Sequence, residues 1–154
     1  MRDRYRYTGC GLDYVYLLNG YTLHETEYGA GVSIEDARRL HERVALDIIG
    51  DPHPLRGQEV RFLRGMMKVS QEGLARVLRQ RRGSVARWEA EAGKAIPGAA
   101  DSALRMFYAL KAGGHEMAVK VVDLLQEIDD LEHGVSKARD LQLRNDGGWM
   151  RAAA

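Results

Sequence analysis

The feature that most constrains the fold is the stretch VSQEGLARVLRQRRGSVARWEAE, residues 69–91, whose pattern predicts two short helices joined by a tight turn. Helical spacing directs four apolar side chains into the angle between the helices: Leu74, Leu78, Val85 and Trp88. Small Ala75 allows the second helix to cross the first closely, and Ser70 can cap the first helix. The turn, RQRR, has four long polar residues where a glycine-bearing corner is typical.

Basic charge is concentrated around these two helices. Residues 55–97 carry ten Lys/Arg against four Asp/Glu, a net +6, whereas residues 1–54 are −3 and residues 98–154 are −2. A local basic patch is typical of a protein that binds a polyanion. Charge alone leaves a second interpretation open, in which the arginines only coat exposed faces of a plain helical hairpin.

Composition indicates a soluble globular protein. A chain of 154 residues that is 45% hydrophobic can build one domain or two small ones. No apolar run approaches the roughly 18 residues of a membrane span, and the first residues lack the apolar segment of a secretory signal, so we expect a cytoplasmic location and no membrane. Cys10 is the only cysteine, which excludes an internal disulfide and a thiolate zinc cluster.

The N-terminal third predicts strands followed by a helix. Two β-prone runs, Tyr14–Leu18 and Tyr21–His24, flank Asn19-Gly20, which predicts a hairpin with a type I′ turn. Residues 27–31 are expected in a loop. Ser33 then caps a helix whose apolar stripe is Ile34, Ala37, Leu40/His41, Val44 and Ile48. GDPHPLRG, residues 50–57, is the best candidate for a domain boundary.

Helical patterns dominate the rest of the chain. We expect helices at about 57–67, 71–78, 82–91, 100–112 and 115–132. The last has an a/d seam that suits packing on the helical domain or on a second subunit: Met117, Val121, Leu124, Ile128 and Leu131. The predicted fold class is α+β. Its parts are a β-hairpin and helix module over 1–52, an all-α domain over 53–112, and a C-terminal helix and tail over 113–154 that packs or dimerises.

Several positions in fixed register resemble the Cro/repressor-type (XRE) helix-turn-helix family. They are Ser70-Gln71, Leu74-Ala75 and Leu78, then SVARWE at 84–89 and KAIP at 94–97. The resemblance covers residues 55–110 and implies a five-helix repressor-like domain that binds a palindromic operator in double-stranded DNA as a homodimer. By position, it implies base reading by Arg82, Gly83 and Arg87. It implies phosphate or backbone contacts by Gln71, Arg81, Ser84 and Lys94.

The turn departs from that family's pattern. The family usually has glycine where Arg79 stands, a small apolar residue where Gln80 stands, and a Ser or Thr cap where Arg81 stands. Unless the turn differs, Arg79 must adopt a positive φ, at a cost of about 1–2 kcal/mol. The second helix is expected to lack a side-chain cap, which costs about 1 kcal/mol more.

The overall layout is similar to the MqsA-type antitoxins of bacterial toxin–antitoxin pairs. In that family an N-terminal domain with two CxxC zinc pairs grips the toxin, and the C-terminal domain dimerises and represses the operon. Here Cys10-Gly11-Leu12-Asp13 stands where a first pair would be and the second pair is missing, so zinc binding is not expected. The resemblance implies an autorepressor with a toxin partner held by residues 1–50. The alternative is a ligand-responsive or phage-type regulator without a toxin partner.

Other chemistry receives little support from the sequence. His24, Glu25, Glu27, Cys10 and Asp13 follow no metal-ligand spacing, and no phosphate-binding loop or catalytic triad is recognisable, so we expect no enzyme activity and no cofactor. His41 is expected to be a packed histidine. The tyrosines at 5, 7, 14, 16, 21 and 28 suit either a small β core or an interaction surface.

Overall fold

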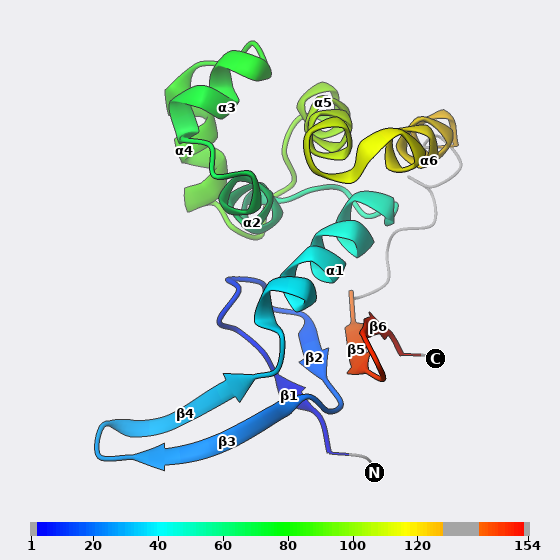
Figure 1. The fold of residues 1–154 in the computed structure, drawn as a ribbon. Helices are drawn as coiled ribbons and strands as arrows, with labels where there is room; N and C mark the ends of the chain where they lie inside the picture. Colours follow the sequence, from blue (N-terminus) through cyan, green and yellow to red (C-terminus); the bar gives the residue numbers. More distant parts are fainter. Residues whose placement is uncertain (1–2, 128–138, 153–154) are drawn as a thin grey trace. The chain divides into compact units, whose positions relative to one another are not determined.

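The computed structural model describes residues 3–127 and 139–152 and has the predicted α+β fold. The chain divides into two units (Figure 1). The first unit comprises residues 1–44 and 138–154, and the helical unit comprises residues 45–137. The division falls inside helix α1, Ala37–Gly50, and not in the 50–57 segment where a boundary was expected.

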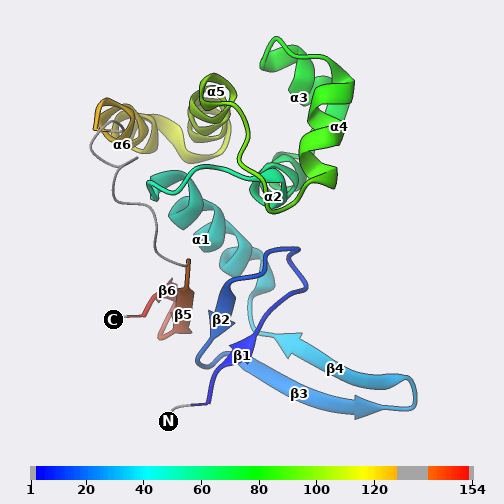
Figure 2. The same ribbon diagram turned by 180° about the vertical axis from the view of Figure 1, so that it is seen from behind.

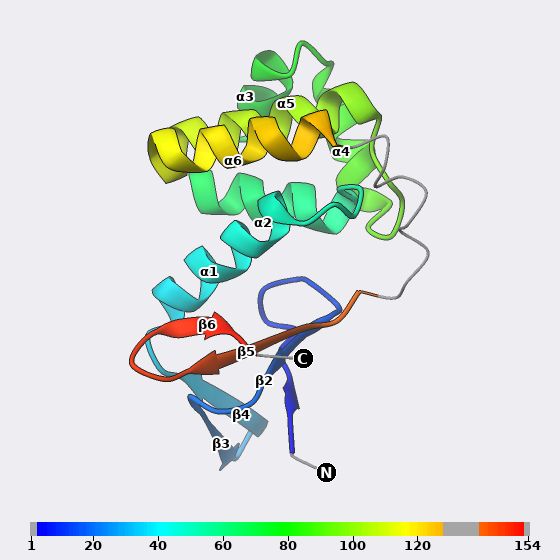
Figure 3. The same ribbon diagram turned by 90° about the vertical axis from the view of Figure 1, so that its right-hand side faces the viewer.

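The first unit is built on a four-stranded sheet in the order β1-β2-β5-β6 (Figure 3). Its strands are Tyr5–Arg6, Val15–Leu17, Leu141–Asn145 and Trp149–Arg151. Strands β2 and β5 are parallel, with Val15 opposite Leu141 and Leu17 opposite Leu143, and the other two pairs are antiparallel. All four of these apolar side chains are buried. The tail expected at the end of the 113–154 segment therefore contains two strands, which the sequence did not predict.

The prediction of a hairpin at Asn19-Gly20 is also wrong. Strand β3 (Tyr21–Thr26) pairs with β4 (Gly29–Ile34), not with β2. Gly20 does turn the chain, with φ 75°, but the turn docks on the β5–β6 connection. The Asn19 carboxamide accepts from the Asn145 N–H at 2.7 Å, and a Cβ on Gly20 would lie 2.7 Å from the Trp149 ring.

The start of α1 also differs from the prediction. Residues 29–31, expected in a loop, belong to β4. Ser33 lies in the same strand, where its hydroxyl hydrogen-bonds to His24 Nε2 at 2.8 Å, so it does not cap the helix. The helix begins at Ala37 after Asp36, which has φ 47° and whose carbonyl accepts from the Leu40 N–H.

The helices of the second unit lie where the sequence predicts them (Figure 2). They are α2 (Gly57–Met67), α3 (Gln71–Val77), α4 (Arg82–Ala90), α5 (Gly98–Tyr108), the π-helical turn η1 (Ala109–Gly113) and α6 (Gly114–Gln126). In the α6 seam, Val121 is buried and Met117 and Leu124 are half-buried. Ile128 and Leu131 lie outside the described residues. Within the described ranges, no helix has the length and apolarity needed to cross a membrane.

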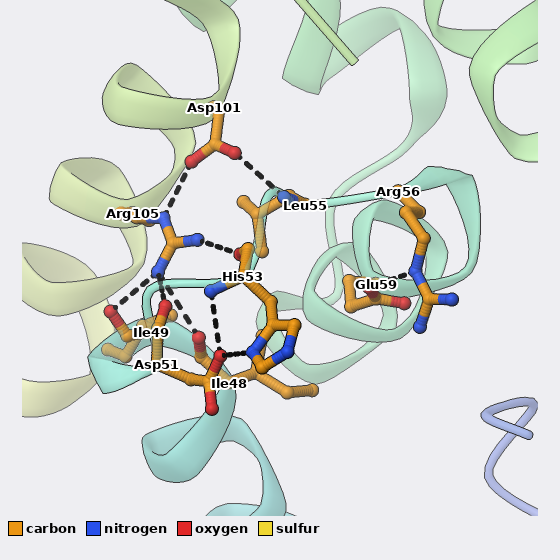
Figure 4. Close-up of polar contacts among 9 residues, drawn as sticks. All are labelled: Ile48, Ile49, Asp51, His53, Leu55, Arg56, Glu59, Asp101 and Arg105. Atoms are coloured by element: carbon orange, nitrogen blue, oxygen red, sulfur yellow. Dashed lines mark hydrogen bonds and ion pairs between the residues drawn. The ribbon is translucent and has the colours of Figure 1, made fainter. Parts of the chain in front are cut away.

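The 50–57 segment belongs to the helical unit because Arg105 of α5 fixes it. The Arg105 side chain is 1% exposed and donates to the carbonyls of Ile48, Ile49, Asp51 and His53 at 2.6–3.3 Å (Figure 4). Its Nε donates to Asp101 at 2.6 Å, and the other Asp101 oxygen accepts from the Leu55 N–H at 2.7 Å. We call this group of contacts the Arg105 clamp. It satisfies carbonyls at the C-terminal end of α1 that have no partner within the helix.

Candidate nucleic-acid interface

The α3–α4 motif, residues 71–90, has the predicted local structure. The Ser70 hydroxyl accepts from the Gly73 N–H at 2.9 Å and caps α3. The side chains expected between the helices are buried, with exposed fractions of 6% or less: Leu74, Ala75, Leu78, Val85 and Trp88. These contacts confirm the packing register read from the sequence.

The turn between α3 and α4 places Arg79 in the left-handed region, with φ 57°, which is the first of the two alternatives left open for this turn. The Arg79 N–H donates to the Arg76 carbonyl, and the Gln80 N–H donates to the Ala75 carbonyl at 2.8 Å. This pair of bonds is a Schellman motif, in which glycine usually occupies the Arg79 position. A non-glycine residue there costs about 1–2 kcal/mol. Arg81 precedes α4 in an extended conformation and makes no side-chain cap, which is as predicted.

An ion pair that the sequence did not single out sets the orientation of α4. Arg64 of α2 donates from Nε and Nη2 to the two carboxylate oxygens of Glu89, at 2.7 and 2.8 Å. Its Nη1 donates to the Val69 carbonyl, just before α3. The hydrogen bond to Glu89 raises the pKa of Arg64 above its ordinary value. Glu89 is only 6% exposed, so one guanidinium joins α2, α4 and the residue that leads into α3.

The loop after α4 is fixed by the start of α2. A Cβ on Gly57 would lie 1.7 Å from the Trp88 carbonyl oxygen, so only glycine allows this close approach. The Gly57 N–H donates to the Lys94 carbonyl at 3.2 Å, and the Ile96 N–H donates to the Leu55 carbonyl at 2.9 Å. These bonds hold the backbone of Lys94, one of the predicted contact residues.

Ion pairing leaves the basic surplus of residues 55–97 unneutralised. All four acidic residues of this range have a basic partner: Arg56–Glu59, Arg64–Glu89, Arg76–Glu72 and Lys94–Glu91. The other six cations are exposed and form no ion pair among the described residues: Arg61, Lys68, Arg79, Arg81, Arg82 and Arg87. Five of these six lie on α4 or at the turns beside α3. Five of the six surplus positive charges are therefore carried by solvent-facing side chains around the α3–α4 motif, and the sixth is Arg61 on α2.

The predicted site residues fall into three places. Arg81, Arg82 and Gly83 are exposed at the start of α4, and Ser84 is half-buried beside them. Arg87 and Lys94 line one groove of about 490 Å³ at the other end of α4, together with Trp88, Glu91, Ala95, Ile96 and Pro97. Gln71 stands apart as the first residue of α3 and is half-buried.

Gly83 and Arg87 are four residues apart and share one face of α4. A Cβ on Gly83 would meet nothing within 4 Å, so packing does not require glycine at this position. The missing side chain instead leaves open surface next to Arg87. This arrangement suits close approach of a large ligand to the helix.

The histidine and cysteine side chains of the first unit are placed by packing. The His41 ring stacks on Tyr7 and its Nε2 lies 2.8 Å from the Tyr7 hydroxyl. Burial lowers the pKa of His41 and raises the pKa of the Cys10 thiol and of Tyr7. Within residues 3–127 and 139–152, no three His, Cys, Asp or Glu side chains are grouped so that they could hold a metal ion.

Comparison with protein-family models, with curated proteins and with solved structures gives no match. Three residues that hold the helical unit together were not identified from the sequence: Gly57 and Arg64, which contact the α3–α4 motif, and Arg105, which fixes the 50–57 segment. Arg64 and Arg105 lie at helical spacing from buried apolar residues, Val60 and Met67 in α2 and Tyr108 in α5, and an unexpected cation on such a face is the signal that points to a buried partner. Gly57 carries no comparable signal.

Proposed function

We propose that this protein is a sequence-specific DNA-binding repressor of a bacterium or phage, acting in the cytoplasm as a homodimer on a palindromic operator. The single observation that supports this best is the set of exposed cations around the α3–α4 motif that have no ion-pair partner in the described part of the chain. A plain helical hairpin has no need to leave such a surplus on one motif while its four carboxylates are all paired. A polyanion would neutralise it.

In the proposed complex α4 is the recognition helix and lies in the major groove, while α3 crosses the sugar–phosphate backbone. Arg82 and Arg87 read base edges, because a guanidinium can donate two hydrogen bonds to guanine O6 and N7. Gly83 allows the helix to approach the bases. The remaining predicted contacts, Gln71, Arg81, Ser84 and Lys94, position the protein on phosphates and carry no sequence information.

This proposal is tested by selecting bound sequences from a randomised duplex library, followed by competition gel shifts. We expect an enriched palindrome with half-sites about one helical turn apart. Arg87→Ala should lose discrimination at one base pair, by about 1–3 kcal/mol. Arg81→Ala should weaken all duplexes alike. Unchanged discrimination by the Arg87→Ala protein would overturn the assignment of α4 as the reading helix.

A second function, that of an antitoxin, is favoured by the β3–β4 hairpin. Its register places the side chains of Tyr21, Leu23 and Val32 on one face, and the hairpin pairs with no other strand among the described residues. Leu23 is 61% exposed and Tyr28, at the tip, is 96% exposed. Two-stranded hairpins are marginally stable alone, and exposed apolar side chains on one suit a protein partner.

Residues 21–34 contain Glu25 and Glu27 and no Lys or Arg, so a basic toxin is the partner that complements this hairpin. Replacing Leu23 and Tyr28 together with Ser should abolish co-purification with the product of the neighbouring gene and leave DNA binding unchanged. Binding that survives this change would refute the hairpin as the contact. If no partner exists, a regulator that responds to a small ligand is the alternative, and a thermal-shift screen with metabolites would detect it.

A further inference from the structure

Two cations occupy positions in the helical unit where the backbone disfavours any side chain. Among the described residues of this unit, the non-glycine residues with positive φ are Lys68, with φ 56°, and Arg79, with φ 57°. Both lie in the left-handed region that glycine enters without strain. Lys68 ends α2 two residues before the Ser70 cap, and Arg79 follows α3 by two residues. The two strained positions therefore bracket α3.

The same backbone motif produces the positive φ of Lys68 and of Arg79. The Lys68 N–H donates to the Gly65 carbonyl and the Val69 N–H donates to the Arg64 carbonyl, which repeats the Schellman pattern at Arg79. This motif needs a residue that tolerates the left-handed region, and it needs no charge. Both side chains are exposed and form no ion pair among the described residues, so neither side chain is required by the packing.

We propose that Lys68 and Arg79 are phosphate-contacting residues at the two ends of α3, in addition to the contacts already assigned to Gln71, α4 and Lys94. This inference rests on the proposed DNA-binding function. The first helix of a helix-turn-helix crosses the sugar–phosphate backbone, so both of its ends lie near phosphates, and long flexible cations at these ends can reach them. Glycine would build either turn with less strain. A role in binding explains why an exposed cation stands at each strained position instead.

A structural role for the same cations makes the opposite prediction for stability. A cation near a helix C-terminus interacts favourably with the helix dipole, so its removal would lower the melting temperature. If the side chains serve DNA binding instead, Lys68→Gly and Arg79→Gly relieve the strain, and the melting temperature rises by about 2–6 °C. A higher melting temperature together with weaker DNA binding in the glycine variants is therefore expected only under the proposal.

The test measures melting temperature and the Kd of a 30-base-pair duplex of arbitrary sequence over a range of salt concentrations. Lys68→Gly and Arg79→Gly should each reduce the slope of log K against log salt by about 0.9 for each protomer bound. Arg79→Lys should retain the slope. Asp36→Gly, which relieves a positive φ in the first unit without removing a cation, and Lys120→Gln, which removes an exposed cation of α6, should leave the slope unchanged.

The outcomes separate this inference from the function on which it rests. If Arg81→Ala has a smaller slope than the wild type but Lys68→Gly and Arg79→Gly do not, the phosphate contacts proposed for Lys68 and Arg79 are overturned while DNA binding stands. A lower melting temperature with an unchanged slope assigns both cations to the helix ends. If the wild-type protein shows no salt-dependent binding, both proposals fail.

Discussion

Removing the Arg105 side chain is the strongest available test of how the helical unit is held together. Arg105→Met keeps much of the side-chain volume and removes every donor that Arg105 itself supplies to the clamp, while the Leu55 N–H still donates to Asp101. Asp101, 8% exposed, loses its charged partner, and the carbonyls of Ile48, Ile49, Asp51 and His53 lose theirs. Breaking one side of a buried ion pair costs about 3–5 kcal/mol.

That loss is a large part of the 5–15 kcal/mol by which domains are usually stable. Urea unfolding, followed by the fluorescence of Trp88, should show a lower midpoint with an unchanged dependence on urea. A Trp149→Phe background removes the signal of the first unit, since Trp149 lies in that unit. Arg61→Met is the matched control, because Arg61 is an exposed arginine of α2 with no ion pair to any residue that the structure describes, and it should change stability by less than about 0.5 kcal/mol.

A second variant distinguishes the buried charge from simple loss of packing. Arg105→Met combined with Asp101→Asn should be less destabilised than the sum of the two single changes, because no unpaired carboxylate remains buried. Loss of less than about 1 kcal/mol in Arg105→Met would refute the reasoning that this clamp fixes the 50–57 segment in the helical unit.

Three further changes test other contacts. Gly57→Ala forces a Cβ against the Trp88 carbonyl and should lower the free energy of unfolding by about 1–3 kcal/mol in urea titrations, whereas Gly65→Ala, where nothing lies within 4 Å, should not. Arg64→Gln leaves Glu89 buried without its bidentate partner and should cost about 2–4 kcal/mol; an equal affinity for duplex DNA in this variant would show that the ion pair does not orient α4. Burial lowers the pKa of His41 below its ordinary 6.5, so the unfolded chain binds more protons and stability should fall as the pH drops through 6.5. The urea midpoints at pH 8 and pH 5 should differ less in His41→Gln than in the wild type, and an equal difference in the two proteins would contradict this.

The helices from residue 57 to residue 108 could be predicted because their signals are local. The apolar spacing, the Ser70 cap and the pattern on both sides of the turn all lie within a few residues of the structure they specify. The position of Arg79 after α3 narrowed its turn to two alternatives, a positive φ or a different turn, and the structure has the positive φ. The surplus of positive charge was also readable, since it depends only on composition within residues 55–97.

The first unit could not be predicted in the same way, because its strands choose distant partners. Asn19-Gly20 is a strong local hairpin signal, but β2 instead pairs in parallel with residues more than 120 positions away, and Asn19 bonds to Asn145. The alternation of Leu141 and Leu143 extends over too few residues to identify a strand without its partner. Ser33 likewise has the residue type and position of a helix cap, but it lies within β4 because that strand pairs with β3.

The organisation of the site also depended on pairing in space. Composition gave the net +6 but not which cations are neutralised. In the structure Arg64 is paired, while Arg79, Arg81, Arg82 and Arg87 form no ion pair within residues 3–127 and 139–152. The proline-containing 50–57 segment has the composition of a linker. It is held in the helical unit because a buried arginine from a helix 50 residues later donates to its backbone.

The most direct test of sequence-specific DNA binding is the ratio of two Kd values for the whole protein at one physiological salt concentration. One duplex carries the palindrome enriched by selection, and the other carries the same base pairs in scrambled order. We predict that the wild-type protein binds the palindrome at least about 1,000-fold more tightly. Equal Kd values for the two duplexes would contradict the proposal that α4 reads sequence.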